Sequence, residues 1–97
     1  ETEFGIFLNL LVHKHKTIDL PRLLALYTTN PARLLGLKSG ALSLGAKADI
    51  TLIDPDLEWM VNAAKFESAS RNTPFDGWKL KGRAVRTIVG GKSVWSL

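Results

Sequence analysis

The first third of the chain carries the hydrophobic spacing of helices. Between residues 4 and 12, apolar side chains recur every three or four residues and so fall on one helix face: Phe4, Phe7, Leu8, Leu11 and Val12. A second helix is predicted to begin after Asp19, which can cap its free N–H groups, with Pro21 in the first turn. Asn30 begins a third, short helix over residues 30–35, which Gly36 ends.

From residue 41 onward the pattern changes to that of strands. Residues 48–54 are rich in β-branched and apolar side chains, and Pro55 with Asp56 predicts a turn that closes this strand. Further strands are predicted at residues 57–61, at the alternating residues 78–88, and, after the hairpin signal Gly90-Gly91, at residues 92–95. Because the helices do not alternate regularly with the strands, the sequence predicts an α+β fold.

Length and composition narrow the class of protein. Ninety-seven residues, of which 45% are hydrophobic and 23% charged, suit one small globular domain and are too few for a complete barrel enzyme of about 250 residues. The absence of cysteine excludes disulfides, thiolate metal sites and cysteine nucleophiles. No apolar run approaches the roughly 20 residues of a membrane span. The chain begins with Glu1 and not with methionine, so we expect a processed product or a fragment.

His13 and His15 form the most obvious candidate metal site. Two imidazoles with one residue between them lie on the same face of a strand and can chelate a metal there. Here they follow a helical pattern, in which positions two apart point about 200° away from each other. The neighbouring cations Lys14 and Lys16 also disfavour binding of another cation. The favoured interpretation is therefore the solvated C-terminal end of a helix.

Four carboxylates lie within ten residues and could exchange protons if they faced each other in a cleft: Asp49, Asp54, Asp56 and Glu58. The favoured interpretation is that they are acids of strand ends and turns. Asp49 precedes an apolar strand, and we expect it to order backbone or to pair with a lysine.

Residues 68–77 form a loop with its own candidate side chains. Arg71 could bind a carboxylate through two parallel hydrogen bonds, and Asn72 and Thr73 could bond backbone and hold the loop. An ordered structural loop is favoured over a substrate-binding loop.

The net charge of +4 comes entirely from the last quarter of the chain. Residues 72–97 hold five basic residues and one acidic residue, whereas residues 1–71 hold eight of each. Basic residues among tryptophans can bind nucleic acid. The strict alternation over residues 78–83 instead favours the solvated face of a half-buried sheet, so no nucleic-acid partner is expected.

Several motifs together resemble the C-terminal end of the cyclic amidohydrolases. The segments that carry this resemblance are residues 30–37 (NPARLLGL) and residues 45–55, in which Gly45 precedes ADITLIDP. Residues 70–77 (SRNTPFDG), with Gly82 and Gly91 after them, narrow the resemblance to the dihydroorotase family. The resemblance runs over nearly the whole chain, and Glu1-Thr2 is similar to the stretch after that family's last active-site segment.

The resemblance implies a zinc-binding (β/α)8 barrel flanked by a small β-sandwich. Residues 1–40 would be the C-terminal barrel helices, and residues 41–97 the C-terminal part of the composite sandwich. The implied activity of the full-length parent is the reversible, zinc-dependent cyclisation of N-carbamoyl-L-aspartate to dihydroorotate in cytoplasmic pyrimidine synthesis.

The family's metal ligands lie in segments that this sequence does not contain. The resemblance therefore assigns no catalytic, cofactor-binding or metal role to any residue here, and His13, His15, Arg71 and Asn72 receive none. No zinc is expected in this chain, and the parent alone would bind zinc and the small-molecule substrate. The 97 residues by themselves are expected to be inactive.

The implied parent also predicts partners. Barrel helices and sandwich strands without their neighbours leave apolar faces and strand edges open, and such edges recruit other chains. We expect association with the remaining N-terminal part of the enzyme or self-association, with no membrane or nucleic acid involved. Two other functions stay open: an allantoinase or hydantoinase-like enzyme, and a catalytically silent homologue that serves as a structural subunit.

Overall fold

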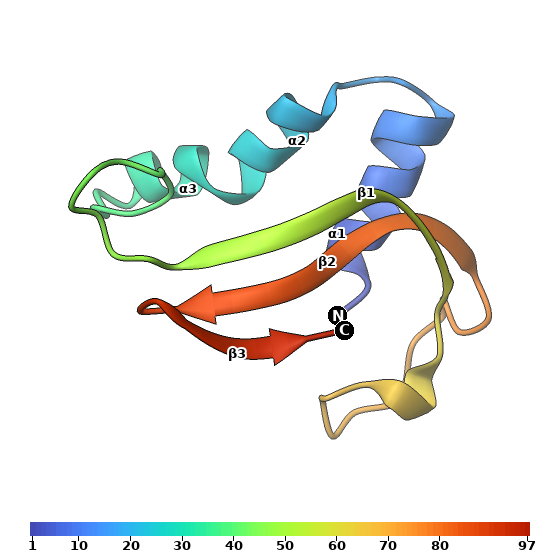
Figure 1. Cartoon of the computed structure of the whole chain (residues 1–97). Coiled ribbons are helices and arrows are strands. Elements are labelled where there is room, and N and C mark those ends of the chain that lie inside the picture. The colour runs from blue at the N-terminus through green and yellow to red at the C-terminus, as the bar shows by residue number, and fades with distance from the viewer.

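A three-stranded antiparallel sheet forms the centre of the chain, with strand order β1-β2-β3. The computed structural model describes all residues, 1–97. In Figure 1 the helices lie along one side of the sheet, and both chain ends meet next to β3. The elements in chain order are α1 (Glu3–Phe7), the π-helix η1 (Leu8–Lys14), α2 (Leu20–Tyr27), α3 (Thr29–Leu34), β1 (Ile50–Met60), the short 3₁₀-helix η2 (Ala63–Lys65), β2 (Lys79–Val89) and β3 (Lys92–Ser96). The predicted α+β class is confirmed.

The strand β1 corrects one sequence-based expectation. Pro55 and Asp56 do not end a strand, because β1 continues through them and pairs with β2 on both sides. Between Asp54, which pairs with Arg83, and Glu58, which pairs with Lys81, β1 advances four residues while β2 advances two. A proline has no N–H to donate to the ladder, so the strand bulges at this point and then resumes.

The first helix also departs from the predicted stripe over residues 4–12. The helix changes from α to π geometry at Leu8. The side chains after this point therefore no longer fall on the face expected from a uniform period of 3.6 residues per turn. Ile6 and Leu8 are 8% and 0% exposed, whereas Phe7, a member of the predicted stripe, is 41% exposed. Contact with β2 therefore decides which side chains of this helix are buried.

Two glycines let α1 approach the sheet closely. A Cβ atom on Gly5 would lie 2.7 Å from a ring carbon of Trp59, and one on Gly82 would overlap the side chain of Leu8. Gly82 also has a φ of +93°, a conformation that L-residues rarely adopt. The core forms beside this approach from Ile6, Val61 and Leu80, with Leu10, Trp59, Phe66 and Phe75 packed against it.

The remaining helices follow their sequence signals. Asp19 caps α2, because its Oδ1 accepts a hydrogen bond of 2.8 Å from the N–H of Arg22. The third helix begins at Thr29, one residue before the predicted start, and Gly36 follows its end with a φ of +65°. None of the helices has both the length and the apolar character needed to span a membrane. The division into a barrel part and a sandwich part at residue 40 stays a prediction.

Replacement of Gly82 by alanine is expected to lower the free energy of unfolding by about 3 kcal/mol, because the new methyl group overlaps Leu8 and the positive φ is strained. Urea unfolding followed by tryptophan fluorescence measures the loss. The matched control is Gly36→Ala, which has a positive φ but no atom within 4 Å of the new Cβ. That variant is expected to lose only about 1 kcal/mol, so equal losses would contradict the packing explanation.

Candidate functional site

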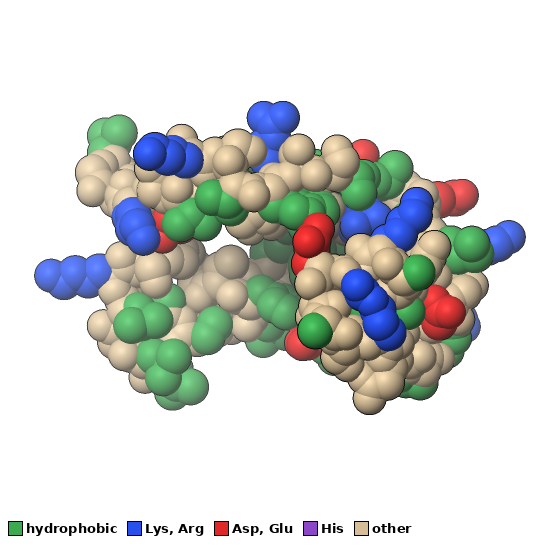
Figure 2. Space-filling view, turned by 90° about the horizontal axis from the view of Figure 1, so that it is seen from below, with side chains coloured by type: hydrophobic (Ala, Val, Ile, Leu, Met, Phe, Trp, Pro, Cys, Tyr) green, Lys and Arg blue, Asp and Glu red, His purple; other side chains and the backbone are tan.

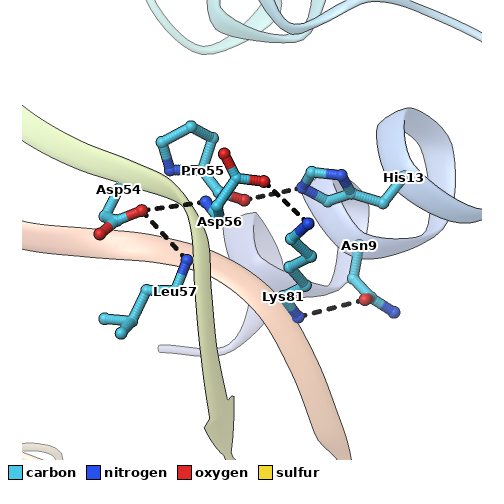
Figure 3. A network of polar contacts seen from close by, with 7 residues as sticks. All are labelled: Asn9, His13, Asp54, Pro55, Asp56, Leu57 and Lys81. Atoms are coloured by element: carbon cyan, nitrogen blue, oxygen red, sulfur yellow. Dashed lines mark hydrogen bonds and ion pairs between the residues drawn. The ribbon is translucent and has the colours of Figure 1, made fainter.

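The bulge in β1 is held by a network of polar contacts that we call the β1 joint (Figure 3), formed by Asn9, His13, Asp54, Pro55, Asp56, Leu57 and Lys81. Asp54 shapes the bulge from within, because its Oδ1 accepts hydrogen bonds of 3.0 Å from the N–H groups of Asp56 and Leu57. The carboxylate thus supplies the partners that these N–H groups would otherwise have found in a regular ladder.

The helix η1 is attached to both strands at this joint. His13 Nε2 lies 2.7 Å from the carbonyl oxygen of Pro55 and donates the hydrogen bond, since a carbonyl can only accept. Asn9, one turn earlier, accepts a bond of 3.1 Å from the N–H of Lys81 in β2. Figure 3 shows both side chains extending from the helix toward the strands. These contacts join segments 42 and 72 residues apart in the sequence.

An ion pair completes the β1 joint. Lys81 Nζ lies 2.8 Å from Asp56 Oδ1, and the side chains of Lys81 and Asp56 are 39% and 73% exposed. The hydrogen bond and charge of Lys81 lower the pKa of Asp56 below its ordinary value, and Asp56 in turn raises the pKa of Lys81. Since both groups keep their charges at neutral pH, the pair orders the surface of the joint and offers no proton to exchange.

The two candidate histidines do not form a site together. Both lie at the C-terminal end of the helix η1, as predicted, and His15 is exposed as expected. His13 is not solvated, because it is half-buried and bonded to Pro55. No group of three or more His, Cys, Asp or Glu side chains in the chain is arranged to hold a metal ion. The residues present therefore do not fit the zinc centre that the family resemblance implies for the parent.

Asp49, another acidic candidate, is also engaged locally, whereas Glu58 lies inside β1 opposite Lys81 of β2. Asp49 accepts a hydrogen bond of 2.7 Å from the N–H of Gly90 and lies 3.2 Å from the ammonium group of Lys47. The Gly90 N–H, followed by Lys47, lowers the pKa of this carboxyl. The expectation that Asp49 orders backbone and pairs with a lysine is confirmed, and the contact ties the start of β1 to the β2–β3 hairpin.

Residues 66–68 at the start of the long loop are held from two sides. The Glu1 carboxylate accepts hydrogen bonds from the N–H groups of Glu67 (3.1 Å) and Ser68 (2.7 Å), and the Ser68 N–H is the main cause of the lowered pKa of Glu1. Arg71 donates from Nη1 to the carbonyls of Phe66 and Ser68. The guanidinium of Arg71 therefore binds backbone carbonyls, which agrees with an ordered structural loop.

The rest of the loop agrees with the same interpretation in part. Thr73 Oγ1 accepts a hydrogen bond from the N–H of Phe75, as expected, whereas Asn72 bonds the hydroxyl of Ser70 and not backbone. Asp76, which sequence reasoning did not single out, accepts a bond of 2.8 Å from the N–H of Ala63. It joins the end of the loop to η2.

The basic residues near the C-terminus are partly used inside the structure. The guanidinium carbon of Arg83 lies 4.5 Å from the ring centre of Trp59, and partial burial lowers the pKa of Arg83. The Trp59 indole N–H donates to the Gly82 carbonyl at 3.1 Å. With Lys81 paired to Asp56, two of the five basic residues in this part of the chain interact with its own side chains.

Two of the hollows in the surface bear on a candidate site. The larger, which we call the sheet cleft, has a volume of about 930 Å³ and is bounded by the N-terminal residues, the loop at residues 65–68 and the strands β2 and β3. Figure 2 shows this hollowed face with apolar side chains on its sides. The cleft is lined by Trp59 and Trp95 and by the Glu1 carboxylate.

The smaller hollow, which we call the helix groove, lies between the first helix and α2–α3. Its volume is about 450 Å³, and its lining residues are Glu3, Phe7, Leu11, Leu23, Leu26, Tyr27 and Pro31. The Tyr27 hydroxyl donates a bond of 2.9 Å to Glu3, and its ring meets Phe4 edge to face at 5.4 Å. Partial burial and the Glu3 carboxylate raise the pKa of Tyr27 to about 12.

Comparison with known proteins shows the family of this chain. The model of the amidohydrolase family matches residues 1–94 of the 97. The chain belongs to the amidohydrolase family. The resemblance to dihydroorotases is likewise confirmed: 93 residues are 50% identical to the dihydroorotase of Geobacter sp. strain M21 and 48% identical to that of Citrifermentans bemidjiense. Each comparison covers 96% of this chain but 22% of the relative.

Solved amidohydrolases contain the same shape. The L-hydantoinase (dihydropyrimidinase) from Arthrobacter aurescens superposes on 95% of this chain with a TM-score of 0.82 and 32% identity. The dihydropyrimidinase from Brevibacillus agri NCHU1002 superposes on 96% with a TM-score of 0.86 and 25% identity. The superposed part is 21% and 20% of those chains. The chain thus spans about a fifth of the length of the cyclic amidohydrolases to which it is similar.

The His13→Ala variant is expected to lose about 1 kcal/mol of stability, because the Pro55 carbonyl loses its donor at a half-buried position. Urea unfolding at neutral pH measures the change. His15→Ala is the matched control, since its side chain is exposed, and should leave the midpoint unchanged. An equal effect of the two substitutions would contradict the role of His13 in the β1 joint.

Ionisation of Tyr27 tests the hydrogen bond between Tyr27 and Glu3 in the helix groove. Tyr27 is the only tyrosine, so the absorbance of tyrosinate reports it directly and should show a midpoint near 12 in place of the ordinary 10. Because the pKa of Tyr27 is raised in the folded chain, protonated Tyr27 stabilises that chain. This contribution to the free energy of unfolding is complete below pH 10 and is lost as the pH rises toward 12. Glu3→Gln should lower the midpoint by removing the negative charge, and an unchanged midpoint would contradict the contact.

Proposed function

We propose that this chain is a structural part of a dihydroorotase, an enzyme that reversibly cyclises N-carbamoyl-L-aspartate to dihydroorotate in pyrimidine synthesis. The observation that carries the proposal is the 50% identity to a dihydroorotase over 96% of the chain. The loop at residues 66–77 supports it, because its Arg71, Thr73 and Asp76 hold the loop and agree with a framework role.

In this proposal the reacting groups lie outside the 97 residues. The side chains here are committed to backbone carbonyls, backbone N–H groups and local ion pairs, and none is arranged with others as metal ligands. Zinc would be held by the rest of a cytoplasmic parent, and the isolated chain would be inactive. Residues 1–40 would belong to the barrel of that parent and residues 41–97 to its sandwich domain.

A hydantoinase-like enzyme is the second candidate. The specific observation in its favour is structural, since both solved neighbours are dihydropyrimidinases and superpose on this chain with TM-scores of 0.82 and 0.86. The sequence identity of 32% and 25% to these proteins is lower than the 50% and 48% to the dihydroorotases. We therefore rank it below the dihydroorotase proposal.

Two hybrid enzymes distinguish these candidates. In one, the 97 residues replace the matching segment of the dihydroorotase of Geobacter sp. strain M21, and in the other that of the L-hydantoinase from Arthrobacter aurescens. The first hybrid is expected to cyclise N-carbamoyl-L-aspartate within about tenfold of its parent's kcat/KM, a loss of about 1.4 kcal/mol in transition-state stabilisation. The second hybrid is expected to lose a far larger share of its parent's kcat/KM for hydantoin hydrolysis, because the hydantoinase residues around the new segment match it less well.

Circular dichroism and thermal melting of each hybrid ensure that a loss of activity is not a loss of folding. A folded first hybrid without dihydroorotase activity, beside an active second hybrid, would overturn the proposal in favour of a hydantoinase-like enzyme. Turnover of N-carbamoyl-L-aspartate by the isolated 97 residues would contradict the assignment of the reacting groups to the rest of the parent.

A further inference from the structure

Arg83 is the half-buried cation of the sheet cleft, and it has no anionic partner in the chain. Its guanidinium carbon lies 4.5 Å from the centre of the Trp59 ring, so the cation lies over the indole face. The chain has two ion pairs, and Arg83 belongs to neither of them. The guanidinium of Arg71 is bonded to backbone carbonyls, whereas that of Arg83 makes no hydrogen bond within the chain. The N–H groups of Arg83 are therefore available to an anion that enters the cleft.

The indole ring under Arg83 is held from two sides. Trp59 Nε1 donates a hydrogen bond of 3.1 Å to the carbonyl oxygen of Gly82. On the other side the ring lies so close to the first helix that a Cβ atom on Gly5 would be 2.7 Å from one of its carbons. A cation that rests on a fixed ring is ordered before binding and loses little conformational entropy when an anion pairs with it.

Arg83 determines the charge of the inner part of the cleft. The other charged residues of the lining are Glu1, Lys65 and Glu67. The Glu1 carboxylate already accepts hydrogen bonds from the N–H groups of Glu67 and Ser68. The side chains of Lys65 and Glu67 are exposed, lie two residues apart and have opposite charges. Partial burial lowers the pKa of Arg83, and pairing with an anion would offset this loss of hydration.

The rest of the lining suits a flat apolar body. Its volume of about 930 Å³ lies within the roughly 300–1,000 Å³ of small-molecule sites. Apolar side chains and two hydroxyl groups line it beside Trp59 and Arg83: Phe4, Met60, Phe66, Trp95, Thr87 and Ser96. Such a cleft combines one positive charge with aromatic surface.

We propose that the sheet cleft binds a small aromatic carboxylate, with the carboxylate group on Arg83 and the ring among the apolar side chains. A planar guanidinium offers two parallel N–H groups that match the two oxygens of a carboxylate. A phosphate ester is a poorer ligand, because it carries close to two negative charges at neutral pH and would meet a single half-buried cation near the Glu1 carboxylate. The proposal is independent of the proposed function, since it involves no reacting group.

Titration of the 97-residue chain with benzoate, followed through the indole N–H signals in ¹H–¹⁵N spectra, tests this site. The signal of Trp59, assigned with Trp59→Phe, should shift, whereas that of Trp78, which lies outside the cleft, should not. Arg83→Gln should weaken benzoate binding by about tenfold or more, because the charged hydrogen bonds are lost. Benzyl alcohol, which has the same ring and no charge, should bind more weakly than benzoate by a similar factor.

The matched control is Arg86→Gln, since Arg86 is exposed on the same strand and does not line the cleft. It should leave the affinity for benzoate unchanged, and circular dichroism of both variants should match that of the unsubstituted chain. Equal losses in the two variants would overturn the proposal. Equal affinities for benzyl alcohol and benzoate, or tighter binding of inorganic phosphate than of benzoate, would also overturn it.

The hybrid dihydroorotase described above tests the site within a longer enzyme. By isothermal titration calorimetry, this hybrid should bind one more benzoate than its Arg83→Gln form, whereas its Arg86→Gln form should bind as many as the hybrid itself. An equal number of bound benzoate molecules in the hybrid and its Arg83→Gln form would overturn the proposal.

Discussion

The close approach of the first helix to the sheet is the constraint on which the rest of this structure depends. Leu8 occupies the space that a side chain at position 82 of β2 would fill. Gly5 leaves room on the helix for the ring of Trp59. Leu8 is fully buried as a result, and Ile6 meets Leu80 and Val61 in the core. Ten of the 97 residues are buried, and Ile6, Leu8, Val61 and Leu80 are four of them.

Gly5 and Gly82 allow the first helix to approach the sheet, and the β1 joint fixes the direction of that helix. Apolar packing next to Gly82 sets the distance between helix and sheet but would tolerate rotation, whereas the hydrogen bonds of Asn9 and His13 each have one partner. Pro55 creates the need for the joint by interrupting the ladder, and its carbonyl then becomes the acceptor for His13. A local defect in the strand thus provides the attachment point for a distant helix.

Other polar side chains of the chain are also bonded to its own backbone. Glu1, Arg71 and Asp49, which are chemically able to bind a substrate, are bonded to backbone groups of the loop and the hairpin. The sheet cleft and the helix groove are lined by residues of the helices, the strands and the loop.

The sequence by itself determined the local elements and the family. The Asp19 cap, the Gly36 stop, the Gly90-Gly91 hairpin and the alternation before it depend on neighbouring residues, so they could be predicted from spacing alone. Tertiary structure alone decided that β1 continues through Pro55, that the helix turns to π geometry at Leu8, and that His13 is bonded to the sheet. Each of these outcomes depends on contacts between segments tens of residues apart, and the energies of such contacts outweigh local preferences that differ by only about 1 kcal/mol per residue.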